Sequence, residues 1–211
     1  MVAAVRKSTA GRSHAERRRE AETAILQAAL RIISKRGMDQ LTLAEAGEAA
    51  GYSRALPAHY FGSREALLTA VAEHVVEAYR TRLRAGDRAE APRGLEGVLA
   101  GVAFYVDDSR KSATRLRGFY EVLNAGLRRP AIAPAVARLN RDSVDSFARS
   151  IRAALDMGEV RPDLDPDTEA VLVLAALRGL MTQWLLAPEQ IDIERSRDAL
   201  VAGFRRSWTG A

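Results

Sequence analysis

Apolar residues recur at helical spacing along nearly the whole chain, without the sustained alternation of apolar and polar positions typical of half-buried strands. The first stripe falls in a predicted helix over residues 15–36, where one side carries Ile25, Leu26, Ala29, Leu30, Ile32 and Ile33. Gly37 follows and supplies the residue that ends the helix. The pattern predicts an all-α fold.

Two short helices are predicted next. The Thr42 hydroxyl can accept a hydrogen bond from the amide of Glu45, and the Glu45 side chain can reach back to the Thr42 amide, as in a capping box. Gly51 ends this helix after about two turns. Ser53 is the predicted N-cap of a second helix that runs to Phe61. Small residues at 46, 47, 49 and 50 let the pair approach closely, so this corner has the shape of a helix-turn-helix.

Six more helices complete the prediction. Ser63 caps a long amphipathic helix to about Arg84, and a linker over 86–94 contains Pro92. The remaining helices are predicted at 94–107, 110–127, 132–156, 167–187 and 193–207. About nine helices result. The predicted domains are a basic N-terminal arm (1–14), a three-helix helix-turn-helix domain (15–62), a connecting helix (63–85) and a larger helical domain (86–211).

Positive charge gathers in the N-terminal part. Of the net charge of +5, residues 1–85 carry 14 Lys and Arg against 9 Asp and Glu, whereas residues 86–211 carry 18 against 18. This distribution suggests an anionic partner such as the phosphate backbone of DNA. A solvated basic tail is the equally weighted alternative. The corner by itself also leaves a purely structural role open.

Composition excludes several functions. The chain has no cysteine, which removes disulfides and thiolate chemistry, and its three histidines, His14, His59 and His74, lack metal-site spacing. No catalytic constellation is found, so we expect neither an enzyme nor a cofactor or metal. We also expect no signal peptide and no membrane span, because Arg178 and Gln183 interrupt the apolar run 170–187, and therefore a cytoplasmic protein. A helical adaptor for protein partners is the remaining rival.

The N-terminal part resembles the TetR (tetracycline repressor) family of transcriptional regulators over roughly residues 21–70. The resemblance rests on Gly37, Thr42, Ala50 to Ser53, Tyr60-Phe61, Ser63-Arg64-Glu65 and Leu67-Leu68, which agree in order and spacing. The chain departs from the family in having Ala58 where tyrosine is usual, Arg64 where lysine is usual, and the uncommon Pro57.

This resemblance implies a recognition helix over residues 54–61 in the DNA major groove. Arg54, Ala55 and Leu56 would then read bases, with Arg54 pairing bidentately with guanine; alternatively Leu56 packs inward. Phosphate contacts are expected from Thr42, Ser53, His59, Tyr60, Arg64, Arg17 and Arg18. Thr42 and Ser53 cap helices in either case, and simple solvation is the alternative for Arg17 and Arg18.

For the larger domain the resemblance implies a small-molecule pocket and a dimer interface. The expected pocket residues, each of which has core packing as its alternative, are Phe104, Tyr105, Phe119, Tyr120, Asn124, Arg178, Met181 and Trp184. The expected interface residues are Leu172, Leu180, Leu185, Leu200 and Phe204. The implied protein is a homodimeric regulator of palindromic double-stranded DNA, commonly a repressor that an unidentified small-molecule effector releases. The operator, the regulated genes and the effector do not follow from the sequence.

Overall fold

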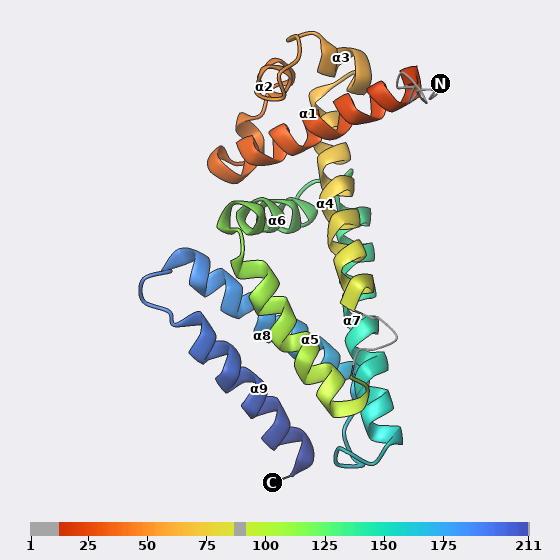
Figure 1. Cartoon of the computed structure of the whole chain (residues 1–211), viewed down its shortest axis with the longest axis vertical. Coiled ribbons are helices and arrows are strands. Elements are labelled where there is room, and N and C mark those ends of the chain that lie inside the picture. The colour runs from red at the N-terminus through yellow and green to blue at the C-terminus, as the bar shows by residue number, and fades with distance from the viewer. Residues whose placement is uncertain (1–12, 87–91, 211) are drawn as a thin grey trace, which may run out of the picture.

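The computed structural model describes residues 13–86 and 92–210. This part of the chain contains no strand and forms nine α-helices and one 3₁₀ turn, which confirms the all-α prediction (Figure 1). The elements are α1 (His14–Arg36), η1 (Met38–Gln40), α2 (Leu43–Ala49), α3 (Leu56–Phe61), α4 (Arg64–Gly86), α5 (Gly94–Arg110), α6 (Ala113–Gly126), α7 (Ala133–Asp156), α8 (Pro166–Leu186) and α9 (Ile193–Thr209).

The helices are distributed between two ends of an elongated molecule. Helices α1 to α3 lie together at one end, α5, α8 and α9 lie toward the other, and α4 runs from the first end along α7 (Figure 1). Helix α6 lies across the molecule and packs against α1. Helix α4 contacts α1 and α3 at one end of the molecule and α7 along the rest of its length, so it belongs to neither end alone. The predicted domain limits therefore remain a prediction. Most of the basic arm and residues 87–91 of the predicted linker lie outside the described residues.

The apolar stripe of α1 forms the core of the first end. Ile25, Ala29 and Ile33 are fully buried, as are Leu67, Leu68 and Val71 of α4, and α1 packs against α4. Burial of each large aliphatic side chain contributes about 1.5–3 kcal/mol. Packing of this kind is what holds α2 and α3 in place, because helices this short are not stable by themselves.

Half of the predicted capping box at Thr42 is present. The Thr42 hydroxyl accepts a hydrogen bond from the Glu45 amide at 3.2 Å. The Glu45 carboxylate, however, accepts from the Thr42 hydroxyl at 3.0 Å and from the Arg36 guanidinium at 2.9 Å. The hydrogen bond from Arg36 lowers the pKa of Glu45 and draws its carboxylate toward the end of α1. A complete capping box is instead found between Ser13 and Glu16, at the start of α1.

The predicted N-cap at Ser53 is wrong. Helix α3 begins at Leu56, after a turn in which the Leu56 amide donates to the Ser53 carbonyl at 3.2 Å. The cause is Pro57: it has no amide hydrogen, so it cannot make the helical bond to the carbonyl four residues earlier, which is that of Ser53. The first helical bond of α3 runs from His59 to the Ala55 carbonyl at 3.2 Å. Arg54 and Ala55 therefore precede the helix.

Gly47 sets how closely α2 and α3 approach. A Cβ atom at this position would lie 2.6 Å from the Ser53 carbonyl oxygen and 3.0 Å from the Pro57 ring. The first of these neighbours is backbone, which cannot move without displacing the turn before α3. A side chain at position 47 is thus incompatible with the observed corner.

Helix α8 has an unusual composition for a helix of this length. By length and composition it qualifies as a membrane span, with a mean hydropathy of 1.4 in its most apolar window, of which 28% is buried inside the chain. Arg178 and Gln183 therefore do not bring this helix below the length and composition of a span, although a single helix that meets them is weak evidence of a membrane. Val173, Leu174 and Leu177 are buried, and α8 packs along α7, so one side of the helix belongs to the core and the other is exposed.

We predict that Gly47→Ala lowers the free energy of unfolding by about 1–3 kcal/mol, because the added methyl group displaces the Ser53 backbone. The matched control is Gly101→Ala in α5, where a Cβ has only an ordinary 3.7 Å contact with Phe147. There the higher helix propensity of alanine should stabilise the protein by about 0.5–1 kcal/mol. Urea unfolding at a fixed protein concentration measures both variants; equal effects at the two positions would contradict this account of the corner.

Candidate DNA interface and ligand cavity

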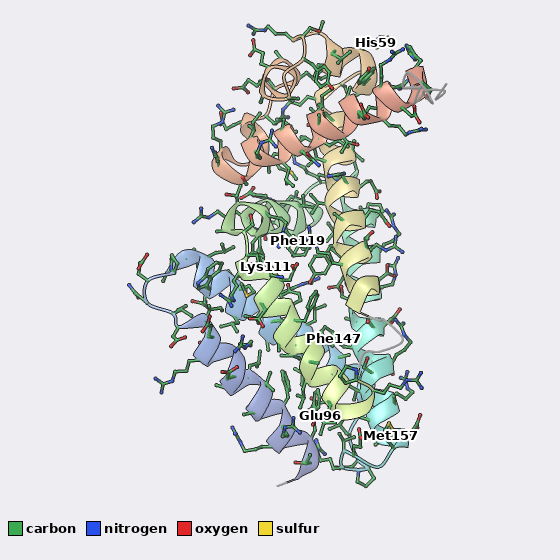
Figure 2. The ribbon with its side chains drawn as sticks, in the orientation of Figure 1. His59, Glu96, Lys111, Phe119, Phe147 and Met157 are labelled. Atoms are coloured by element: carbon green, nitrogen blue, oxygen red, sulfur yellow. The ribbon has the colours of Figure 1, made fainter. Side chains whose placement is uncertain are left out.

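The turn before α3 and the outer side of α3 are open to solvent at one end of the molecule. Ser53, Arg54, Ala55 and His59 are exposed, and Figure 2 shows His59 at the outer edge of this end. Tyr60 is half-buried. The structure thus brings together the predicted base readers and several of the predicted phosphate contacts on one surface.

Arg54 is the most available cation of this surface. Its side chain is 73% exposed, and its guanidinium lies 3.4 Å from the Glu48 carboxylate. An exposed ion pair of this kind contributes about 0–1 kcal/mol, so it opposes a competing contact only weakly. The Arg54 guanidinium is therefore free to exchange Glu48 for a base edge or a phosphate.

Leu56 and the α1 arginines meet in a groove between α1 and α3. Leu56 is half-buried and packs against the core, which favours the inward alternative for this residue. The groove is lined by His14, Arg17, Arg18, Glu20, Ala21, Tyr52, Leu56 and Tyr60. The Arg18 guanidinium lies 5.2 Å from the centre of the Tyr60 ring and donates to Glu22 at 2.8 Å. This arrangement joins the basic N-terminal turns of α1 to the side of α3.

Arg64 has a different environment from the one expected of a phosphate contact. Its guanidinium donates to three backbone carbonyls, those of Leu41 at 2.7 Å and of Met38 and Asp39 at 2.9 Å each. These carbonyls belong to the 3₁₀ turn between α1 and α2 and to the residue that follows it. The planar guanidinium suits several simultaneous bonds better than an ammonium group would. Arg64 thereby fixes the start of α4 to the helix-turn-helix.

A cavity of about 240 Å³, hereafter the main cavity, lies between α4, α5 and α7. It is lined by Tyr79, Arg82, Pro92, Gly97, Val98, Ala100, Gly101, Phe104, Tyr105, Asp108, Ser109, Ser146, Phe147 and Ser150. Two of the predicted pocket residues, Phe104 and Tyr105, are among them. Tyr79, Arg82 and Phe147 were missed; the signal available for the first two was their position one turn apart near the end of the long α4.

A second cavity of about 220 Å³ lies between α1, α4 and α6, and Phe119 is one of its lining residues. It shares Tyr79, Arg82, Asp108 and Ser109 with the main cavity. The Tyr79 ring stacks on Phe119 with ring centres 4.7 Å apart and meets Tyr105 edge-on at 6.0 Å. Figure 2 shows Phe119 beside α6 and Phe147, a residue of α7, farther from the DNA-facing end. Tyr79 therefore belongs to the wall of both cavities.

The remaining predicted pocket residues lie elsewhere. The Tyr120 hydroxyl donates to the Arg178 carbonyl at 2.9 Å, and the Arg178 guanidinium donates to the Asn140 side chain at 2.7 Å. Met181 is fully buried and Trp184 packs against the core. Asn124 is exposed on the outer side of α6. None of these five lines either cavity. The buried side of α8, which carries Met181, packs against α7 instead.

Burial keeps the three tyrosines of this region neutral. Desolvation raises the pKa values of Tyr79, Tyr105 and Tyr120 above the ordinary value of a phenol. All three hydroxyls therefore remain hydrogen-bond donors at neutral pH. Tyr79 and Tyr105 add hydroxyl groups to the wall of the main cavity, which also carries Arg82, Asp108 and Ser109.

A helix-turn-helix exposed at the end of an all-helical chain, joined by one helix to a body with a cavity, defines the class of helix-turn-helix DNA-binding regulators. Residues 25–71 match the family model of bacterial regulatory proteins, tetR family, and residues 94–207 match that of the BetI-type transcriptional repressor, C-terminal. The chain belongs to the TetR family and is a transcriptional regulator, as the resemblance of its N-terminal part implied.

Individual proteins agree with this assignment. The HTH-type transcriptional regulator BetI of Burkholderia mallei is 30% identical over 80% of this chain and 83% of its own length. A TetR-family transcriptional regulator from Rhodococcus sp. has 25% identity and a TM-score of 0.70, covering 88% of this chain and 97% of that one. A transcriptional regulator from Saccharomonospora viridis, solved in complex with choline, has a TM-score of 0.74 at 21% identity, covering 86% and 94% respectively, and shows the same fold.

We predict that Arg64→Met lowers the free energy of unfolding by about 1–3 kcal/mol, because it leaves partly buried carbonyls without their donor. Arg54→Met removes an exposed guanidinium and should change stability by less than about 0.5 kcal/mol. Chemical denaturation of both variants separates the two roles. If Arg64→Met instead lost DNA affinity at unchanged stability, the original interpretation of Arg64 as a phosphate contact would be supported.

We also predict different losses of DNA binding from Arg54→Ala and Arg17→Ala. Arg54→Ala should weaken binding to the preferred site by about 1–3 kcal/mol and remove the preference for one base at a single position. Arg17→Ala should weaken binding to all sequences alike and reduce its salt dependence. Titration of the preferred site and of single-base variants at several salt concentrations measures both effects. Uniform losses from both variants would contradict the separate roles.

Proposed function

We propose that this regulator is a homodimeric repressor that binds a palindromic operator through α3 and is released by a small molecule in the main cavity. The observation that carries the proposal is the position of α4. The side chain of its first residue, Arg64, donates a hydrogen bond to the Leu41 carbonyl just before α2. Its last turns place Tyr79 and Arg82 in the walls of both cavities. One rigid element thus connects the DNA-facing surface with the place where a ligand fits.

The exposed side of α8 supports a dimer. An apolar stripe runs along it through Val171, Leu172, Ala175, Gly179 and Leu186, and its three large side chains are 52%, 51% and 75% exposed. The exposed Gln183 interrupts this stripe between Gly179 and Leu186, and an exposed apolar patch of this kind is typical of a surface that a partner covers. Two copies of the stripe can face each other across a two-fold axis, which also matches a palindromic site.

The five interface residues expected from the sequence do not all lie on this stripe. Leu172 does. Leu180, Leu185, Leu200 and Phe204 are half-buried and pack against the core of their own chain. Helix α9, which carries the last two, packs against α5. We therefore place the centre of the proposed interface on the outer side of α8, with α9 beside it.

Release requires that the ligand favour one arrangement of α4 over another. A ligand that fills the main cavity contacts Tyr79 and Arg82, so it acts directly on the end of α4. The choline complex of the similar regulator supports a small molecule as the effector class. Residues 94–207 match a family described as a BetI-type transcriptional repressor, which supports repression rather than activation of transcription. A DNA-binding regulator of this kind acts in the cytoplasm.

The proposal is tested by selection from a random duplex library with the full chain, followed by titration of the enriched site. We expect a palindrome whose half-sites are one helical turn or more apart, bound by one or two dimers. A single asymmetric site bound by a monomer would refute the dimeric arrangement. A reporter placed behind the enriched site, compared with and without the regulator gene, tells repression from activation.

We predict that Leu172→Glu converts the dimer to a monomer at micromolar concentration and weakens operator binding at least tenfold. A charge at the centre of an apolar interface must be desolvated without a partner. Leu127→Glu is the matched control, because Leu127 is 86% exposed and lies outside the stripe. Sedimentation velocity measures the association state. A Leu172→Glu variant that remains a dimer would exclude the α8 stripe as the interface.

A further inference from the structure

The charged groups at the border of the two cavities are unbalanced. Asp108 lies 3.4 Å from the Arg115 guanidinium, 3.6 Å from the Lys111 ammonium and 3.9 Å from the Arg82 guanidinium. Arg115 also donates to the Asp108 carbonyl at 2.6 Å. The Lys111 side chain is 65% exposed and lines neither cavity, so Arg82 and Arg115 against Asp108 leave an excess of one positive charge at the cavities. Asp108 is thus already engaged by groups other than Arg82, which is the most distant of the three.

Arg82 is the cation of this cluster that lines both cavities. Burial lowers the pKa of its guanidinium, and the neighbouring charge of Arg115 lowers it further. The Arg82 side chain is 36% exposed and its Asp108 contact is long at 3.9 Å, so its charge is compensated by solvent more than by a close ion pair. An anion placed beside it would relieve this charge.

The rest of the main cavity suits an apolar body. Its aromatic walls are Tyr79, Phe104, Tyr105 and Phe147, and Gly101 leaves room along α5. The Tyr105 hydroxyl is buried close to the Tyr79 and Tyr120 hydroxyls and makes no hydrogen bond of regular geometry with either. This hydroxyl is a donor near the same end of the cavity, because Tyr105 contacts the Tyr79 ring. A buried hydroxyl without a regular hydrogen bond is costly, and a ligand acceptor would satisfy it.

We infer that the effector is an amphipathic anion, an aromatic or aliphatic carboxylate whose acid group pairs with Arg82 and whose apolar body fills the main cavity. This inference rests on the proposed function and names the chemistry of the same site. A planar guanidinium binds a carboxylate through two parallel hydrogen bonds, which gives orientation as well as affinity.

A cationic ligand such as choline fits these residues less well. Asp108 is the single acidic side chain among the described residues that line the main cavity. Its side chain is 21% exposed and is shared by three cations. A quaternary ammonium would find aromatic faces but no free carboxylate, and it would be repelled by Arg82. This chain therefore differs in ligand charge from the regulator solved with choline.

The test uses three probes that share one apolar body and differ in the head group: 4-phenylbutyrate, 4-phenylbutanol and (3-phenylpropyl)trimethylammonium. Isothermal titration calorimetry with the full-length dimer measures the Kd of each. We expect the carboxylate to bind at least tenfold more tightly than the alcohol and the ammonium to bind most weakly. Fluorescence anisotropy on the selected operator then shows whether the carboxylate releases DNA.

Variants at Arg82 assign the preference to one side chain. Arg82→Gln should remove the advantage of the carboxylate while leaving the affinity for the alcohol unchanged, and Arg82→Lys should retain part of it. The matched control is Arg117→Gln, which removes a positive charge from the exposed side of α6. It should leave all three affinities unchanged. Unchanged alcohol binding in Arg82→Gln shows that the cavity itself is intact.

Two results overturn the inference. The first is tighter binding of the ammonium than of the carboxylate, which leaves the main cavity as an effector site but reverses the ligand charge. The second is no binding of any probe, which excludes a ligand of this class from the cavity. In both cases operator binding by the same preparation, measured without ligand, decides independently whether the proposed function stands.

Discussion

The structure depends on α4 being one continuous helix. Arg64 and Arg82 are 18 residues apart in it, which corresponds to about 27 Å at the rise of an α-helix. Its first half is fixed, since Leu67, Leu68 and Val71 are fully buried and Arg64 is bonded to the turn after α1. Its second half carries Tyr79 and Arg82 at the cavities. Because the hydrogen bonds of a helix resist bending, a displacement at one end is carried to the other.

The helix-turn-helix obeys a second, local constraint. Pro57 is buried and lacks an amide, which moves the start of α3 beyond Arg54 and Ala55. Gly47 permits the close approach that this turn needs. The consequence is a recognition element whose proposed base readers lie largely in the turn rather than in the helix. Their positions are set by contacts between α2 and α3, since α3 alone is too short to be stable.

Local features of the fold were predictable, and features that join distant residues were not. The number of helices, the Thr42 cap and the glycine after α1 were predictable because each depends on residues a few positions apart in the sequence. Ser53 failed as a cap because its carbonyl would have to accept from the amide of residue 57, and Pro57 has no amide hydrogen. The bonds of Arg64 join residues 23 to 26 positions apart, and the cavity forms between three helices. Which side of α8 is exposed likewise depends on which side meets α7: Leu180 and Leu185 are partly buried, whereas Val171 and Leu186 are exposed.

The two ends of the molecule are held together by contacts of unequal strength. At the corner between α6 and α7, Arg129 pairs with Glu65 at 3.1 Å and with Asp39, but both carboxylates are largely exposed, and such pairs contribute about 0–1 kcal/mol each. Gly118 of α6, in contrast, packs so closely on Leu30 of α1 that a Cβ there would lie 2.6 Å from the leucine side chain. Close apolar packing resists deformation more than exposed ion pairs do. The α1–α6 contact and α4 therefore define how the DNA-facing end sits on the rest of the chain, and the second cavity lies between these same three helices.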